Sequence, residues 1–187
     1  RRRPQRSRKR RGGVHIAGMG GNLITEIIDA HPEIAREAEV VILQPRNNLE
    51  KLRAYLEENG YFVFCQEVVP EDDKWSEIIT FSDGRFPVWA AEYITRAPRL
   101  LFRNPFLNAI TREFPPLYVS EYEIWKRNDD PRAGYIKSFA EHRLAVHKKI
   151  RDEISANSTS EEALKTLASE NEMIDAYEKT LELLDTL

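Results

Sequence analysis

Three glycines interrupt the first apolar stretch of this sequence, at positions 18, 20 and 21. Residues 14–17 are a short, mainly apolar run that predicts a buried strand, and apolar residues spaced three and four apart in 23–28 predict a helix after it. Glycines in such a turn permit a positive φ and let a ligand or another backbone approach closely. The turn is therefore a candidate wall of a binding site, although a purely structural tight turn explains the glycines equally well.

A dinucleotide-binding fingerprint has the same strand–turn–helix layout and needs glycine at the first, third and sixth positions of G-x-G-x-x-G. Gly18 and Gly20 satisfy the first two positions, but Leu23 occupies the sixth. The acidic ribose ligand is also absent about 20 residues later, where the next apolar run ends in Gln-Pro-Arg at 44–46. A dinucleotide-binding module in which Arg46 meets a 2′-phosphate stays open as an alternative.

The rest of the apolar pattern predicts an α/β protein that ends in helices. Residues 40–43 form a second continuous apolar run, and a helix capped by Asn48 and ended by Gly60 follows it. Two β-rich runs, 61–69 and 75–81, flank a polar turn and predict an antiparallel pair. Residues 84–131 predict irregular connections with short helices, and from Gly134 onward the pattern predicts two antiparallel helices.

The two predicted tail helices carry separate apolar stripes. The first stripe extends from residue 136 to residue 154, and the second has a seven-residue recurrence. Ser158 and Thr159 each precede a glutamate by three residues, as in a capping box, and so predict the start of the second helix. The members of the second stripe are Leu164, Leu167, Ile174, Tyr177, Leu181 and Leu184.

Composition indicates a soluble, cytoplasmic protein with a packed core. The chain has 187 residues, of which 41% are hydrophobic and 10% aromatic. No apolar run approaches the roughly 20 residues that span a bilayer. The single cysteine, Cys65, lies in an apolar run and is expected to be a buried thiol. Four scattered histidines predict no metal site.

The basic residues are concentrated at the N-terminus. Residues 1–11 hold eight of the 28 Lys and Arg and none of the 31 Asp and Glu, so the rest of the chain has a net charge of −11. An arginine-rich arm can bind nucleic acid through its phosphates. So polar a run cannot offset its ordering entropy, and we expect residues 1–12 to be a disordered extension or an artefact.

Taken in order, several segments resemble a known family. They are Ile16-Ala17-Gly18-Met19-Gly20-Gly21, then Leu43-Gln44-Pro45, an amphipathic helix, Gly60, a strand with Glu67, and Trp75-Ser76-Glu77-Ile78-Ile79. This series is similar to the bacterial tRNA (adenine-22-N1)-methyltransferases, class I enzymes that use S-adenosylmethionine. The resemblance covers residues 13 to about 82. It implies the C-terminal half of a Rossmann-like α/β sheet, followed by a helical, coiled-coil-like hairpin.

The resemblance also implies a reaction, which is methyl transfer from S-adenosylmethionine to N1 of adenine in tRNA. A non-enzymatic RNA-binding or interaction protein is a further alternative. In the family, the strand before the glycine turn would be the fourth of the sheet. The residues implied to line the catalytic pocket are Gly18, Met19, Gly20, Gly21 and Asn22, and those implied to bind substrate are Gln44, Pro45, Arg46 and Asn47.

The family's first half has no counterpart ahead of residue 13, where there is no strand with an acidic, Gly-rich turn. The resemblance therefore predicts that this chain is a fragment without the donor-binding half. It divides the chain into a partial Rossmann-like methyltransferase domain at 13–95, an irregular connection at 96–132 and a helical hairpin at 133–187.

The chemistry requires little of the protein beyond positioning. Adenine N1 carries a lone pair at neutral pH, so it can displace a sulfonium methyl group directly without a strong base. The amides of Asn22, Gln44 and Asn47 could hydrogen-bond the edge of a flipped base. Each of these amides is more often a cap or turn residue.

The first tail helix is basic, and its side chains could hold tRNA phosphates. An equally good alternative is a solvated helix face paired with the acidic second helix. His142 and His147 lie five residues apart, so they do not share the face that two metal ligands on a helix need. The candidate RNA-binding residues are Lys137, Arg143, His147, Lys148, Lys149 and Arg151.

Overall fold

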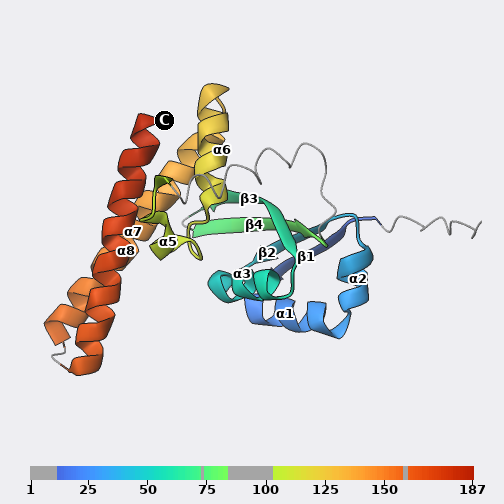
Figure 1. Cartoon of the computed structure of the whole chain (residues 1–187), viewed down its shortest axis with the longest axis horizontal. Helices are drawn as coiled ribbons and strands as arrows, with labels where there is room; N and C mark the ends of the chain where they lie inside the picture. Colours follow the sequence, from blue (N-terminus) through green and yellow to red (C-terminus); the bar gives the residue numbers. More distant parts are fainter. Residues whose placement is uncertain (1–11, 73, 84–102, 158–159) are drawn as a thin grey trace, which may run out of the picture.

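A four-stranded mixed sheet forms the centre of the protein (Figure 1). The computed structural model describes residues 12–72, 74–83, 103–157 and 160–187. The strands β1 (Val14–Met19), β2 (Val41–Pro45), β3 (Phe62–Glu71) and β4 (Lys74–Ser82) lie in the order β1-β2-β4-β3. β1 and β2 are parallel, whereas β4 is antiparallel to both of its neighbours. The predicted antiparallel pair is confirmed, and β1 forms one edge of the described sheet.

The helices α1 (Gly21–Ala30) and α2 (Pro32–Glu37) connect β1 to β2, and α3 (Leu49–Glu58) connects β2 to β3. Of these, α1 and α3 lie on the same side of the sheet in Figure 1. Their apolar stripes bury Ile24, Ile28, Leu52 and Leu56 against the inward residues of the strands. Burial of this apolar face holds the helices to the sheet, because each fully buried aliphatic side chain contributes roughly 1.5–3 kcal/mol.

The C-terminal part is helical, as the sequence predicts. It consists of α5 (Leu107–Ile110), α6 (Pro116–Arg127), α7 (Arg132–Asn157) and α8 (Glu161–Thr186), with α7 and α8 forming the expected hairpin. α5 and α6 lie in the stretch for which the sequence predicts irregular connections with short helices. A second core of aromatic rings joins these helices to the sheet, and in it Trp75 of β4 meets Phe139 of α7 edge to face at 5.7 Å.

Helix ends and stripes show where the sequence analysis was right and wrong. Gly60 follows α3 with a φ of +68°, which is the conformation predicted for a glycine after a helix. α8 begins at Ser160, whose hydroxyl accepts a hydrogen bond from the backbone N–H of Ala163 at 3.1 Å. Ser158 and Thr159, predicted to form the capping box, lie outside the described residues. The assignment of Leu164 to the buried stripe was wrong, because its side chain is 59% exposed near the free end of the hairpin.

Candidate functional site

The two loops predicted to form the site lie side by side at the carboxyl ends of β1 and β2. The backbone N–H of Arg46 donates to the carbonyl of Met19 at 2.8 Å, and the N–H of Gly21 donates to the carbonyl of Asn47 at 2.9 Å. These two bonds join residues 18–22 to residues 44–47. Ligands of open α/β sheets bind outside the carboxyl ends of the strands, so this is the edge at which a site is expected.

Each of the three glycines is needed for a different reason. Gly18 has a φ of +76°, and it is the one glycine of the turn that uses a left-handed backbone. A Cβ at Gly20 would lie 2.7 Å from the side-chain oxygen of Asn47. A Cβ at Gly21 would lie 2.5 Å from the backbone oxygen of Asn48. The turn is thus bare mainly because the loop after β2 packs directly on it.

The prediction that Asn48 caps α3 is right for its position and wrong for its side chain. It does occupy the N-cap position, but its side chain makes no capping hydrogen bond. Its backbone is left-handed, with a φ of +54°, a conformation that asparagine tolerates better than most residues. Its Nδ2 donates instead to Oδ1 of Asn47 at 3.1 Å, so the two asparagines form a short amide pair beside Gly20.

Gln44, the last residue but one of β2, contacts the β3–β4 hairpin. Its Nε2 donates to Oε1 of Glu71 at 3.2 Å and to the hydroxyl of Ser76 at 3.3 Å. Gln44 was predicted as a site residue, but neither of its partners was. A glutamate at the end of one strand and a serine near the start of the next carry no signal of their own until the register of the hairpin is known.

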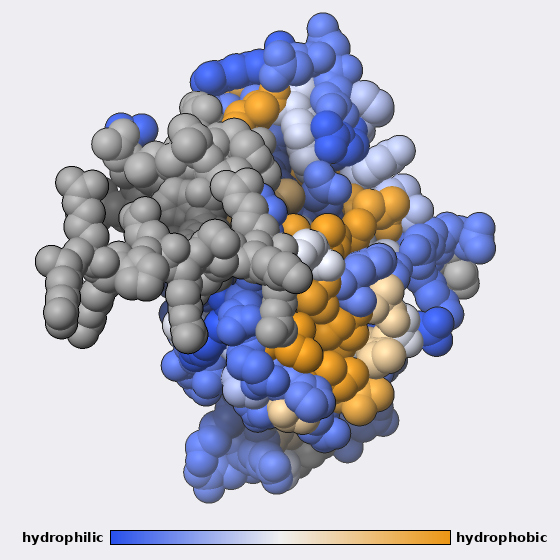
Figure 2. Space-filling model, turned by 90° about the vertical axis from the view of Figure 1, so that its right-hand side faces the viewer, coloured by the Kyte–Doolittle hydropathy of each residue, from blue (hydrophilic) through white to orange (hydrophobic). Residues whose placement is uncertain are grey.

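An apolar patch lies on the side of the molecule that Figure 2 shows, which is the right-hand side of Figure 1, where α2 lies and the chain enters β1. Among the described residues, the exposed large apolar side chains on β1, α1 and α2 are Met19, Leu23 and Ile34, and Leu23 is 48% exposed. Exposed apolar patches rimmed by polar residues mark interaction surfaces.

The six basic residues predicted to bind RNA all have acidic partners in the structure. Lys137 pairs with Asp185, Lys148 with Glu178, Lys149 with Glu153 and Arg151 with Asp152, while Arg143 and His147 both reach Glu113. Most of these partners are on α7 or α8, as the alternative of a paired helix face requires. Lys149 is the most open of the six, since its side chain is 78% exposed and its contact with Glu153 is 3.8 Å long.

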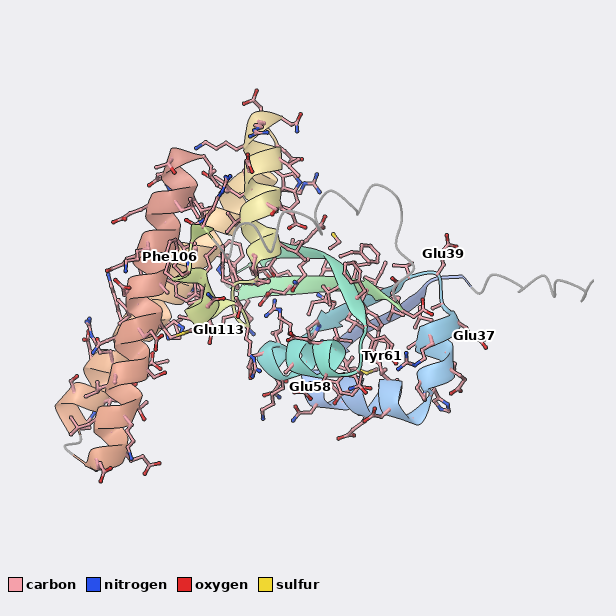
Figure 3. All side chains as sticks on the ribbon, viewed as in Figure 1. Glu37, Glu39, Glu58, Tyr61, Phe106 and Glu113 are labelled. Carbon is pink, nitrogen blue, oxygen red and sulfur yellow. The ribbon has the colours of Figure 1, made fainter. Side chains whose placement is uncertain are left out.

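His147 is a buried structural residue and is not accessible for phosphate contacts. Its Nδ1 lies 2.7 Å from Glu170 and its Nε2 lies 2.9 Å from Glu113. Glu113 precedes α6 and also pairs with Arg143, so it ties the hairpin to the rest of the protein; Figure 3 shows it between the two parts. We call Glu113, Arg143, His147 and Glu170 the hairpin cluster.

Charge pairing sets the protonation of the hairpin cluster. Burial alone would raise the pKa of Glu113, but hydrogen bonds and charges from His147 and Arg143 hold it at about 2. Burial alone would lower the pKa of His147, and its two carboxylate partners raise it above the ordinary value. A carboxylate on each ring nitrogen favours the imidazolium ion, which donates from both nitrogens.

A second buried polar cluster joins α3 and α6 to the sheet. Arg53 of α3 donates to Gln66 at 2.9 Å and pairs with Glu77 of β4, which also accepts a hydrogen bond from the hydroxyl of Tyr118. Nearby, burial raises the pKa of Glu121 well above its usual range. These side chains lie far from residues 18–22 in sequence and support the junction with α6.

Neither cluster was predicted, although the sequence contains a signal for each. Glu77 is charged within a strand that is otherwise mainly apolar. His147 follows Ala140 by seven residues and therefore continues the apolar stripe of α7. A polar residue on an apolar stripe indicates a buried hydrogen-bond partner, because an unpaired polar group is costly to bury.

Metal and membrane sites are not seen in the described part of the chain. No group of three or more possible metal-binding side chains occurs there. None of the described helices is both long and apolar enough to cross a bilayer.

Solved structures confirm the fold class. An uncharacterised Listeria monocytogenes protein is similar with a TM-score of 0.62 and 23% identity over 91% of this chain and 63% of its own. The Bacillus subtilis M1A22 tRNA methyltransferase has a TM-score of 0.61 and 19% identity over 90% and 62%. A Streptococcus pneumoniae putative tRNA (m1A22) methyltransferase, in complex with S-adenosyl-L-methionine, has a TM-score of 0.53 and 21% identity over 90% and 59%.

Sequence comparison gives the family. The tRNA (adenine(22)-N(1))-methyltransferase of Bacillus subtilis (strain 168) is 32% identical over 71 residues, which are 38% of this chain and 30% of that protein. The chain thus spans under a third of this curated relative in the matched segment and about 60% of the solved ones. The family profile described as tRNA (adenine(22)-N(1))-methyltransferase matches residues 6–127. The resemblance found in the sequence is therefore confirmed, and this chain belongs to the tRNA (adenine(22)-N(1))-methyltransferase family.

Proposed function

We propose that this chain takes part in methyl transfer from S-adenosylmethionine to N1 of an adenine in tRNA, and that the joined loops 18–22 and 44–47 form the wall beside the target base. The observation that carries the proposal is the backbone pairing of these loops at the carboxyl edge of β1 and β2. Family membership supports the reaction class, and this backbone pairing supports the proposed position of the site.

The residues of this wall suit a reaction that is catalysed by positioning. Arg46 is the one charged side chain in 18–22 and 44–47, and none of these residues is an acid or a histidine. Adenine N1 uses its lone pair to form the new N–C bond while the C–S bond to the sulfonium breaks, so no proton has to be removed beforehand. Correct placement of the two reactants supplies most of the acceleration of such a step.

Within the wall, we assign different roles to the two loops. Gly18, Met19, Gly20, Gly21 and Asn22 give a surface with few side chains, which leaves room for a flat base. Gln44 and Asn47 offer amides that can hydrogen-bond the edge of the base, and Pro45 and Arg46 complete the rim. The methyl donor, when bound, would supply an electrophilic methyl group to a base held against this wall.

The apolar surface on β1 and α1 supports a larger assembly around the site. β1 has no strand on its outer side among the described residues, and Met19 and Leu23 are exposed beside it. The solved relatives contain chain that this protein does not match. We infer that a donor-binding part of the enzyme packs on this surface. A tRNA substrate further implies that the protein acts in the cytoplasm.

The test compares this chain with an extended protein, in which residues 12–187 follow the part of the Bacillus subtilis relative that precedes its matched segment. We expect the extended protein to bind S-adenosylmethionine in calorimetry and to methylate adenine N1 in tRNA. We expect residues 12–187 alone to bind neither S-adenosylmethionine nor NADP tightly. Saturable NADP binding by the chain alone would overturn the proposal in favour of a dinucleotide module.

A further inference from the structure

The side-chain amide of Gln44 is held in one orientation by two neighbours. Its Nε2 lies 3.2 Å from Oε1 of Glu71 and 3.3 Å from the hydroxyl of Ser76. These partners come from opposite strands of the β3–β4 hairpin, and Gln44 itself stands opposite Ala17 in the β1–β2 pair. The amide thus belongs to the first residue of loop 44–47, at the same edge of the sheet as loop 18–22.

Chemistry fixes which end of the amide faces these partners. An ionised carboxylate can only accept hydrogen bonds, so the group of Gln44 that faces Glu71 must be the NH₂ group. Both N–H bonds of that group are then used, one by each partner. No described residue donates to Oε1 of Gln44. Gln44 therefore presents an acceptor, whereas a freely rotating glutamine would present a donor or an acceptor equally well.

An acceptor at this position distinguishes adenine from bases with a similar shape. The atom next to N1 of adenine carries an exocyclic amino group, which is a hydrogen-bond donor. Hypoxanthine and guanine carry a carbonyl oxygen at the same place. This oxygen would face Oε1 of Gln44, so two hydrogen-bond acceptors would repel each other. A fixed acceptor thus favours adenine twice, through a bond to the right base and repulsion of the wrong ones.

We propose that Glu71 and Ser76 are positioning residues that hold Gln44 as a hydrogen-bond acceptor for the amino group of the target adenine. This role rests on the proposed function, since it requires an adenine to enter beside residues 18–22. Both positioning residues are at least partly open to solvent, and each acts only through Gln44. Their loss should therefore reduce base selectivity and leave the fold and donor binding intact.

Kinetics of the extended protein test this role. The substrates are tRNA with adenine and tRNA with unsubstituted purine at the target position, and the readout is the ratio of their kcat/KM values. The intrinsic difference in reactivity between the two bases is the same for every variant, so it cancels. We expect Glu71→Gln and Ser76→Ala each to lower this ratio about 2- to 10-fold, the effect of one hydrogen bond, while Glu50→Gln on the surface of α3 leaves it unchanged.

A double-variant cycle separates positioning from a general structural effect. Gln44→Ala should lower the ratio at least as much as either single variant, and adding Glu71→Gln to it should change nothing more. An unchanged ratio in Glu71→Gln and Ser76→Ala would overturn the inference while the proposed function stands. Absence of any methyl transfer by the parent extended protein would instead overturn the proposed function, and the inference with it.

A direct view of the amide completes the test. In ¹⁵N-labelled protein, the side-chain NH₂ signals of Gln44 should be displaced from those of a free glutamine side chain and should exchange more slowly with solvent, and both differences should diminish in Glu71→Gln and Ser76→Ala. Signals that match those of a free glutamine side chain in the unsubstituted protein would refute the fixed orientation, whatever the kinetics.

Discussion

Gly21 offers a sharp test of how the two site loops are joined. A Cβ added at Gly21 would lie 2.5 Å from the backbone oxygen of Asn48 and 3.0 Å from that of Asn47. Backbone atoms cannot rotate away, so either the loop at Asn47 and Asn48 must move by close to 1 Å or the start of α1 must shift. Overpacking of this kind costs about 1–3 kcal/mol, and the lost N–H bond from Gly21 to Asn47 adds roughly 1 kcal/mol. We expect Gly21→Ala to destabilise the protein by about 2–4 kcal/mol.

Two other glycines provide matched controls. At Gly20 the added Cβ would meet the side chain of Asn47, which can turn away at the expense of its bond with Asn48, so Gly20→Ala should cost only about 1 kcal/mol. Gly134 is an exposed helical residue with nothing within 4 Å of an added Cβ, and Gly134→Ala should stabilise the protein by up to about 1 kcal/mol.

Urea unfolding of residues 12–187, followed by circular dichroism, measures all three effects from shifts of the midpoint at constant slope. The order Gly134→Ala, Gly20→Ala, Gly21→Ala from most to least stable is the expected result. A Gly21→Ala protein as stable as the parent would show that the loops are not in the backbone contact described here.

Three further predictions concern the hairpin and the sheet edge. The pKa of His147 is raised in the folded protein, so its protonation stabilises the fold fully below the unfolded-state pKa of about 6.5. This stabilisation is lost as the pH rises through the folded-state pKa. Urea midpoints should therefore fall from pH 6 to pH 9 in the parent protein and change less in His147→Gln. Residues 12–187 should self-associate in sedimentation velocity through the free edge of β1, and Ala17→Lys should reduce this; a monomeric parent would contradict it. In the extended protein, Lys148→Glu, Lys149→Glu and Arg151→Glu together should weaken tRNA binding and lower its salt slope by about 2, with S-adenosylmethionine binding unchanged; equal tRNA affinity would place the RNA contacts elsewhere.

The elements that depend on local sequence could be predicted. Each strand is a short apolar or β-rich run, and α3, α7 and α8 have their own apolar stripes, so the ends of these elements were found to within a few residues. The bounds of α2 and α6 were not predicted. The positions of the two site loops also followed, because parallel neighbouring strands bring their carboxyl ends together. These features depend on the spacing of apolar residues and on the order of the elements along the chain, and both can be read from the sequence.

The features that depend on distant contacts could not be predicted. His147 and Glu113 are 34 residues apart, and Gln44 and Ser76 are 32 apart. Their pairing depends on the register of the hairpins and on how the helical part sits on the sheet. The basic residues of α7 illustrate the same limit, since a row of cations indicates an RNA surface or an ion-paired one equally well until the neighbouring helix is placed.

The hairpin cluster has a mechanical consequence. α7 and α8 each have 26 residues, so the hairpin is about 39 Å long at 1.5 Å per residue. Glu113, Glu170 and His147 hold it part-way along α7, which leaves about ten residues, or about 15 Å, between the cluster and the end of α7. Anything bound near the tip would therefore be kept at a fixed distance from the sheet edge, because the hairpin would act as a rigid spacer.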